Sequence, residues 1–402
     1  MNRRVVITGV GAVTPLGMGA DPLIERWTAG ESGIADGLGE CLDFEPLDHL
    51  SKKEARRADR FTQLAVVSAD EALRQSGFGR AGDELPYSSE RIGCIIGTGI
   101  GGIGSLQNQN AILRERGPKA VSPLAVPLMM GNAASAAVSL RYSLKGEVYG
   151  VMSACAAGAH AIGSATRLIE SGRADAAVAG GAESAMTEVA LVAFASMGAT
   201  SPAGISRPFD ARRDGFVMGE GAGILVLEEA GAAEARGAEV IGEITGYAAT
   251  CDANHLTAPD PAGIQSARAI STALDGAGLG AGDLDYINAH GTSTPLNDSS
   301  ETEALKVALG PEAYEIPISS TKSVIGHLMG TGGAVEAVAT TRTLQNGIAA
   351  PTVGLEQPDE QCDLDYIPGE PRPLTASNER LTAISNSFGF GGHNAVLCFA
   401  GP

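Results

Sequence analysis

Four short segments of the sequence combine residue types that could perform nucleophilic catalysis. In the first, an apolar run from Val151 leads into Cys155 and then into a helix-like stretch of small residues. A cysteine at a helix N-terminus faces unpaired N–H groups and the positive end of the helix dipole, which stabilise a thiolate. The small neighbours leave space for a substrate above the sulfur. On position alone, however, a buried and inert cysteine is the stronger interpretation.

The second and third segments carry two histidines and a lysine. His290 follows a strand-like run and opens the hydroxyl-rich turn HGTSTP, whereas Lys322 and His327 lie in TKSVIGHLMG, which leads on to Glu336. A lone histidine or lysine is usually structural or solvated. Two strand-end histidines with a lysine between them, in a chain with only 6 histidines, are harder to explain in that way.

Two glycine-rich turns complete the set. The segment NSFGFGGHN places Phe388 and Phe390 where they would contribute little to a core, which favours a mobile flap with exposed backbone N–H groups. The motif GIGGIG at residues 99–104 matches G-x-G-x-x-G, but no second strand with a terminal acidic residue follows it, so we predict a turn that lines a pocket. No histidine pair has metal-ligand spacing, and we predict no metal site.

The elements that must position these segments are short strand-like runs that alternate with alanine-rich helical stretches. A count of 54 glycines with 4% aromatic residues suits a layered α/β core in which backbones approach closely. Several runs are continuously apolar, as expected of strands buried on both faces. The predicted strands are Arg4–Thr8, Arg91–Ile96, Asp175–Ala179, Ile224–Glu228, Val240–Thr245, Tyr286–Ala289, Pro317–Ser320, Ala383–Asn386 and Ala395–Phe399.

The chain also shows signs of two halves. The polar stretch Glu229–Gly237 is typical of a short helix that Gly237 could cap, so we place a boundary between residues 1–237 and 238–402. A faint repeat relates residues 155–172 to residues 330–347 at an offset of 175 residues. The coinciding pairs are Gly158/Gly333, Ala159/Ala334, Thr166/Thr341, Arg167/Arg342 and Gly172/Gly347. Chance matches are easy in a chain rich in glycine and alanine, so the repeat alone leaves duplication open.

Charge and composition exclude several classes of protein. The net charge of −19 argues against nucleic acid as a partner, because phosphate binding needs a basic surface. No apolar run is long enough for a membrane span, and the segment Met1–Gly9 has no signal-peptide core. Six scattered cysteines without a close pair favour a reducing compartment, and we expect a cytoplasmic protein.

Taken together, the four segments resemble the β-ketoacyl-acyl carrier protein synthases, specifically the elongating, synthase II-like type. The resemblance covers nearly the whole chain, from VVITGVGAVTPLG at residues 5–17 to SFGFGGHN at residues 387–394. It implies a thiolase-like α/β fold, in which two duplicated βαβαβαββ halves form a layered αβαβα architecture. The first half would present Cys155 and the second half the two histidines.

The resemblance also implies a reaction, the decarboxylative condensation of an acyl chain with malonyl-acyl carrier protein. Cys155 would attack the acyl thioester and hold the chain, while its own N–H and that of Phe390 would form the oxyanion hole. His290 and His327, as neutral donors, would polarise the malonyl thioester carbonyl while the enolate develops. Lys322 would sustain the electrostatics around His327 without touching substrate.

Further positions match the family residue by residue. The matches comprise Glu336 as the ion-pair partner of Lys322, Thr257, Thr292 and Thr294 as contacts of the pantetheine arm, Ile100 and Phe194 as the lining of the acyl tunnel, Phe388 and Phe390 as the gating loop, and Asn394 as a further substrate-binding residue. Two positions vary. His393 stands where many members carry threonine, and Met197 stands where some relatives have arginine, which puts one carrier contact in doubt.

The expected partner is acyl carrier protein, which bears the substrates on its phosphopantetheine arm, so no other cofactor is needed. Because that carrier is acidic, a local basic patch is required. Lys53, Arg56, Arg57 and Arg60 have the spacing of one helix face, and we predict that they dock the carrier. The alternative is a solvated face paired with nearby acidic residues. The family also implies a homodimer.

Several related functions stay open at this point. A biosynthetic thiolase shares the fold but uses a second catalytic cysteine, whereas Cys398 lies in an apolar strand. The initiating synthase III uses a His/Asn pair, which His327 argues against. The ketosynthase subunit of a type II polyketide system would carry the same residues, although we favour fatty acid synthesis. A non-catalytic chain-length partner subunit would replace Cys155.

Overall fold

The computed structural model describes residues 3–402 and contains the same order of elements twice. The first set is β1 (Val5–Thr14), α4 (Arg60–Gln75), β3 (Ile92–Gly97), α7 (Ala133–Tyr142), β4 (Val148–Val151), α8 (Ala157–Glu170), β5 (Ala176–Glu183) and β6 (Gly221–Glu229). The second set is β7 (Gly242–Cys251), α11 (Ile264–Ala277), β8 (Tyr286–Asn288), α12 (Pro295–Leu309), β9 (Ile318–Ser319), α14 (Gly332–Asn346), β12 (Thr382–Gly389) and β13 (His393–Ala400). Each set has the order βαβαβαββ.

The strands of the two sets also have the same neighbours. The first set is ordered β4-β3-β5-β6-β1 and the second β9-β8-β12-β13-β7. In both sets the first three strands pair in parallel and the last two pairings are antiparallel. An antiparallel pairing of β1 with β7, over residues 5–7 and 242–244, joins them into one sheet. Duplicated halves, expected from the resemblance, are therefore present.

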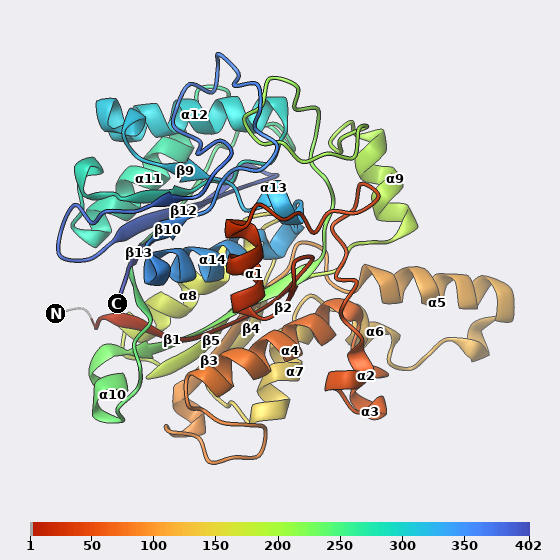
Figure 1. The fold of residues 1–402 in the computed structure, drawn as a ribbon. Helices are drawn as coiled ribbons and strands as arrows, with labels where there is room; N and C mark the ends of the chain where they lie inside the picture. Colours follow the sequence, from red (N-terminus) through yellow and green to blue (C-terminus); the bar gives the residue numbers. More distant parts are fainter. Residues whose placement is uncertain (1–2) are drawn as a thin grey trace.

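The elements stack in five layers (Figure 1). Helices α11 and α12 cover the outer face of the second set of strands, α4 and α7 cover the outer face of the first, and α8 and α14 lie between them. One apolar cluster surrounds the two central helices, and a second and third lie under the outer pairs. The predicted αβαβα architecture is confirmed.

The faint sequence repeat corresponds to the two central helices. A Cβ atom on Gly158 of α8 would lie 2.8 Å from the backbone nitrogen of Ala334, and one on Gly333 of α14 would lie 3.2 Å from the backbone nitrogen of Ala159. Only glycine permits so close an approach of two helix backbones. One matched glycine pair of the repeat, Gly158/Gly333, therefore lies where α8 and α14 contact each other. The other pair, Gly172/Gly347, follows the ends of the two helices with left-handed φ angles of 73° and 66°.

All nine predicted strands are present, with shifted ends. The prediction missed β4, a four-residue strand at the sheet edge that is largely half-buried and lacks a continuous apolar run. The helix expected before Gly237 is α10 (Ala230–Ala235), and Gly237 follows it with the left-handed φ of 71°. Within residues 3–402, no helix is long and apolar enough to cross a membrane.

Shorter elements decorate the two sets. These are β2 (Gly17–Met18), α1 (Ala20–Thr28), α2 (Pro46–His49), α3 (Lys52–Ala55), α5 (Ile103–Arg116), α6 (Ala125–Met129), α9 (Glu188–Ser196), α13 (Lys322–Ile325), β10 (Ile348–Ala349) and β11 (Arg372–Pro373). Most of these insertions belong to the first half, so the two halves share a framework and differ in what is attached to it.

Candidate active site

Cys155 lies between the end of β4 and the start of α8, as the sequence predicted. The residue before it, Ala154, adopts a left-handed φ of 49°, which is uncommon for a residue with a side chain and typical of functional turns. Cys155 is buried, with only 9% of its surface exposed. The turn thus holds the sulfur at the N-terminus of a buried helix.

Two histidines face this sulfur from the other half of the chain. His290 follows β8, and His327 follows the short helix α13 after β9. Because β8 and β9 are neighbouring parallel strands, the segments after them emerge at the same edge of the sheet. His327 Nε2 lies 3.0 Å from Cys155 Sγ, and the two imidazole rings lie 5.5 Å apart at 87°. The three residues form one cluster.

Lys322 and Glu336 form an ion pair behind the histidines, and each side chain is only 1% exposed. The pair joins the start of α13 to the middle of α14. Burial, together with the positive charge of Lys322, holds the pKa of both His290 and His327 well below the usual value of histidine. Both imidazoles are therefore neutral at physiological pH, as expected if they act as neutral hydrogen-bond donors.

The thiol is subject to opposing influences. Burial raises the pKa of Cys155 to about 11, although the backbone N–H of Phe390, the charge of Lys322 and the N–H of Cys155 itself all favour the thiolate. The same two N–H groups are the predicted oxyanion hole. The sulfur is thus protonated at rest, and the groups that favour its anion already surround it.

Buried acidic residues hold the turn that carries His290. The carboxylate of Glu301 accepts hydrogen bonds from the backbone N–H groups of His290 and Gly291, at 2.8 Å each, and from the Asn386 side chain. Asp298 accepts from the N–H of Thr292 at 3.0 Å. Both carboxylates belong to α12, which follows the turn directly. The helix therefore fixes the backbone on which His290 and the threonines stand.

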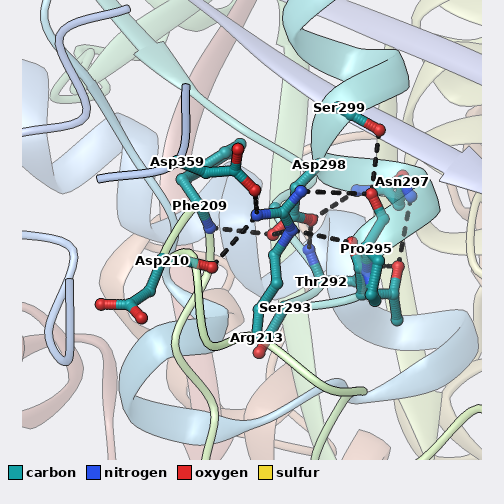
Figure 2. A network of polar contacts seen from close by, with 12 residues as sticks. Phe209, Asp210, Arg213, Thr292, Ser293, Pro295, Asn297, Asp298, Ser299 and Asp359 are labelled. Carbon is teal, nitrogen blue, oxygen red and sulfur yellow. Dashed lines mark hydrogen bonds and ion pairs between the residues drawn. The ribbon is translucent and has the colours of Figure 1, made fainter. Parts of the chain in front are cut away.

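Arg213 completes this support from a distant part of the sequence (Figure 2). Its guanidinium, buried to all but 3%, lies 3.7 Å from the Asp298 carboxylate and donates to Asp359 at 2.5 Å. It also donates to the carbonyl oxygens of Thr294 and Pro295, at 3.4 and 3.3 Å. Arg213 therefore binds the C-terminal part of the HGTSTP turn, whereas Glu301 binds its start, and Arg213 does not line the cavity described below.

The predicted flap contacts the turn that carries Cys155, but the prediction that both of its phenylalanines contribute little to a core is wrong for Phe388. Phe388 belongs to β12 and is buried in the hydrophobic cluster under α11 and α12, because the strand continues to Gly389. A Cβ atom on Gly389 would lie 3.0 Å from the backbone nitrogen of Cys155, so the two segments are in direct backbone contact. The Asn394 side chain donates to Asp252 at 2.7 Å and accepts from Ser266 at 3.1 Å. His393 is half-buried and packs its ring 6.3 Å from that of His160. The flap is thus anchored at its C-terminal end.

A cavity of about 540 Å³ brings the predicted residues together. Of the residues assigned to catalysis and substrate binding, all but Lys322 line it: Cys155, His290, His327, Phe390, Ile100, Phe194, Thr257, Thr292, Thr294, Phe388 and Asn394. Gly99 lines it too, which confirms that the GIGGIG turn borders a pocket. Met197 is a further lining residue. The lining combines the hydrogen-bonded hydroxyls of Thr292 and Thr294 with an apolar group, in which Ile100 and Phe194 pack against one hydrophobic cluster.

The prediction that four basic residues share one helix face is wrong. Helix α3 ends at Ala55, and α4 begins at Arg60 after Asp59, whose side chain caps the new helix. The Arg60 guanidinium donates to the buried carboxylate of Glu220 at 2.6 Å, which occupies it. Lys53, Arg56 and Arg57 are exposed, and Glu54 pairs instead with Arg141. Three of the four residues therefore remain available to a partner.

Sequence reasoning missed several residues around the cavity. Phe216 packs its ring at 5.2 Å and 85° against His327, and Met329 lines the cavity beside Cys155. Glu183 and Arg213 act on distant segments and give no local pattern. For Asp298 and Glu301 a signal was available in the run NDSSE, which follows HGTSTP after one leucine, because carboxylates beside a predicted catalytic turn can bind its N–H groups.

Comparison with known proteins agrees with this geometry. The model of the β-ketoacyl synthase N-terminal domain matches residues 39–233, and that of the C-terminal domain matches residues 241–356. The chain is 47% identical to a Synechocystis protein named 3-oxoacyl-[acyl-carrier-protein] synthase 2, with 99% of this chain and 98% of the relative covered. It is 42% identical, over the same shares, to a Staphylococcus aureus protein of the same name.

Solved structures give the same result at the level of the fold. A β-ketoacyl synthase from Burkholderia phymatum superposes with a TM-score of 0.90 at 36% identity, over the full length of both chains. A type II polyketide ketosynthase, solved with its acyl-carrier protein, superposes with the same TM-score at 30% identity, again over both full lengths. Since both family models match and the relatives are similar over almost the whole chain, the protein belongs to the β-ketoacyl synthase family of condensing enzymes.

Proposed function

We propose that the chain elongates fatty acids by decarboxylative Claisen condensation, joining an acyl chain on Cys155 to malonyl-acyl carrier protein and giving 3-oxoacyl-acyl carrier protein and CO₂. The observation that carries the proposal is the contact of 3.0 Å between Cys155 Sγ and His327 Nε2, with the second neutral imidazole of His290 beside it in one cavity. A thiol with two neutral imidazoles suits attack on a thioester followed by stabilisation of an enolate.

In the first half-reaction, Cys155 Sγ attacks the carbonyl carbon of the acyl thioester. The backbone N–H groups of Cys155 and Phe390 stabilise the oxyanion that forms. The carrier thiolate then leaves and takes up the proton that the Cys155 thiol has lost. The acyl chain extends from the sulfur toward the apolar group of the lining, to which Ile100 and Phe194 belong.

In the second half-reaction, the malonyl group loses CO₂ and its carbonyl becomes an enolate. Neutral His290 and His327 donate N–H hydrogen bonds that strengthen as the negative charge develops, so they favour the transition state over the ground state. The enolate carbon attacks the acyl-Cys155 carbonyl. The carbon–sulfur bond breaks, the 3-oxoacyl product stays on the carrier, and the cysteine recovers its proton from water.

The alternative functions are less well supported. The relatives named 3-oxoacyl-[acyl-carrier-protein] synthase 2 are 42–47% identical, whereas the type II polyketide ketosynthase is 30% identical. A thiolase would need a second cysteine in the site, but Cys398 lies within β13 and its burial raises its thiol pKa to about 12. Within residues 3–402, which the structure describes, Cys155 is the only cysteine that lines the cavity.

We further propose that acyl carrier protein docks on the exposed residues Lys53, Arg56 and Arg57. A chain with a net charge of −19 repels an acidic partner at long range, so docking depends on local positive charge. The likeness to a ketosynthase solved with its carrier supports such a partner. Arg60 is left out of this surface because Glu220 binds its guanidinium.

The edge of the sheet supports a homodimer. Along the described chain no strand pairs with the outer side of β4, and a free edge of this kind invites pairing with another chain. Apolar side chains that are at least about a third exposed surround it, namely Val126, Met129, Met130, Tyr149 and Met152. We propose that a second copy covers this surface and joins the two sheets. Light scattering of the protein and of Met152→Glu tests this: a dimer that the substitution weakens is expected, and a wild-type monomer would refute it.

We place the reaction in the cytoplasm. The six cysteines are all free thiols, and five of them are buried. Reduced cysteines of this kind are typical of a reducing compartment. Fractionation of cells that express the chain tests this location, and recovery from an extracellular or periplasmic fraction would contradict it.

The decisive experiment for the reaction follows the mass of the intact protein. Incubation with a saturated acyl-carrier protein should add one acyl group, and malonyl-acyl carrier protein should then discharge it; Cys155→Ala should acquire none. An adduct from acetyl-CoA that makes no use of malonyl-carrier would indicate a thiolase-like enzyme. No adduct from any donor would refute the proposal and favour a non-catalytic partner subunit.

A further inference from the structure

Glu183 is a fully buried carboxylate beside the active-site cavity that has no role in the mechanism above. It is the last residue of β5 and is 0% exposed. One carboxylate oxygen accepts hydrogen bonds from the backbone N–H groups of Gly99, at 2.5 Å, and Gly330, at 3.2 Å. The other oxygen accepts from the Thr98 hydroxyl at 3.1 Å. The side chain thus links a turn of the first half to a turn of the second.

This arrangement differs from that of several other buried carboxylates. Glu336, Glu220 and Glu228 each pair with a lysine or arginine, whereas no cationic side chain within residues 3–402 lies within ion-pair distance of Glu183. Glu301, which holds the His290 turn, shares this lack of a counter-charge. Burial raises the pKa of Glu183 to about 7, and the surrounding N–H groups, including that of Ile100, oppose the shift. A buried carboxyl group without a counter-charge is costly, so its hydrogen bonds to the two turns are its principal compensation.

The two turns that Glu183 links are in direct contact through glycines. A Cβ atom on Gly330 would lie only 2.0 Å from the backbone nitrogen of Gly99, so no side chain fits between the two backbones. The neighbours of these glycines, Ile100 and Met329, both line the cavity that contains Cys155. Met329 has a left-handed φ of 47°, so its turn needs support from its surroundings.

We propose that Glu183 is a positioning residue that sets the spacing between Ile100 and Met329 and thereby determines which acyl chain lengths the cavity accepts. The inference rests on the proposed function, in which the acyl chain on Cys155 extends along these side chains. Because a single methylene group in an apolar pocket can change a rate about tenfold or more, a small displacement of one wall changes selectivity. The carboxylate positions both side chains together, because one of its oxygens accepts hydrogen bonds from the turn of Ile100 and from the turn of Met329.

Glu183→Gln tests the proposal, because the amide keeps the size of the side chain but replaces one acceptor oxygen with a donor that faces N–H groups. The rate of acyl transfer to Cys155 is measured by intact mass for carrier-bound chains of increasing length, with the KM for malonyl-carrier measured in parallel. We expect the preference between the best and the worst chain to change about tenfold, while the KM for malonyl-carrier stays within about twofold. An equal reduction for every chain length would overturn the proposal.

Two further variants keep the test decisive. Thr98→Val retains the carboxylate but removes the hydroxyl that donates to Glu183 and accepts from the backbone N–H of Gly101 in the same turn, so it should change the same preference by a smaller factor even if Glu183→Gln does not fold. Glu71→Gln is the matched control: this half-buried carboxylate accepts the N–H groups of Ala12 and Ala20 and does not line the cavity. Its chain-length profile should keep the wild-type shape, and an altered profile would overturn the proposal. Failure of the wild-type protein to acquire any acyl group would instead refute the proposed function.

Discussion

Removal of the buried charge of Lys322 should destabilise the protein strongly and in a pH-dependent way. Lys322→Met keeps the length of the side chain and leaves the Glu336 carboxyl buried without its partner. Since both side chains are 1% exposed, we expect a loss of about 3–5 kcal/mol in the free energy of unfolding, as for other buried pairs broken on one side. The double variant Lys322→Met/Glu336→Gln should recover more than half of this loss, because it removes both charges.

The sign of the pH dependence follows from Glu336. Burial already raises the pKa of Glu336 above its ordinary value despite Lys322, and loss of the lysine removes the main influence that lowers it. A carboxyl group whose pKa is higher in the folded state than in the unfolded state is most compatible with folding when it is protonated. Its contribution to the free energy of unfolding is complete below the pKa of the unfolded state and is lost as the pH rises through the pKa of the folded state. The deficit of Lys322→Met relative to wild type should therefore be larger at pH 8 than at pH 6.

Urea unfolding at a fixed protein concentration measures this directly. Trp27 is the single tryptophan of the chain, and it is fully buried with its indole N–H donated to the Pro351 carbonyl, so its fluorescence reports loss of the core. A deficit below about 1 kcal/mol, or one independent of pH, would refute the reasoning that the pair is a compensated buried charge. If Lys322→Met were as stable as the wild type but inactive, the lysine would act through the charge it presents to the histidines and not through stabilisation of the fold.

Three further predictions follow from the site. Alkylation of Cys155 by iodoacetamide should accelerate about tenfold per pH unit between about pH 7 and 9, because its thiol pKa is about 11, and mass spectrometry that finds a plateau in this range would contradict the assignment. Arg213→Met should raise the KM for carrier-bound substrates about tenfold while the alkylation rate stays near wild type, since Arg213 holds the HGTSTP turn, which we expect to bind the pantetheine arm, and does not touch the thiol; a fall in kcat at constant KM would argue against this role. Charge reversal of both Arg56 and Arg57 should raise the KM for acyl-carrier protein and leave that for a pantetheine mimic nearly unchanged, and equal effects on the two substrates would exclude docking at this surface.

The parts of the fold that were predicted correctly are those with strong local patterns. The strands around Ile95 and Val226 are continuous apolar runs because both faces of the sheet are covered by helices, and such runs are visible without the structure. The edge strand β4 escaped prediction because one side of it is open and Gly150 interrupts the pattern. The basic stretch misled the prediction for a local reason: Asp59 caps a new helix, so the spacing of the charges does not continue through one helix.

The sequence by itself determined the chemical groups and the order of the motifs, because both depend on local residue types. The duplicated framework was expected only through the family resemblance, since the repeat alone left duplication open. The tertiary structure decided what those groups do to one another. Cys155 and His327 are 172 positions apart, and only the packing of the two halves brings their side chains to 3.0 Å. The pKa values of the thiol and the imidazoles depend on burial and on Lys322, and the support from Glu183 and Arg213 acts on backbone groups of distant turns. These are long-range properties, since desolvation and hydrogen bonding arise only when the chain has closed around each group.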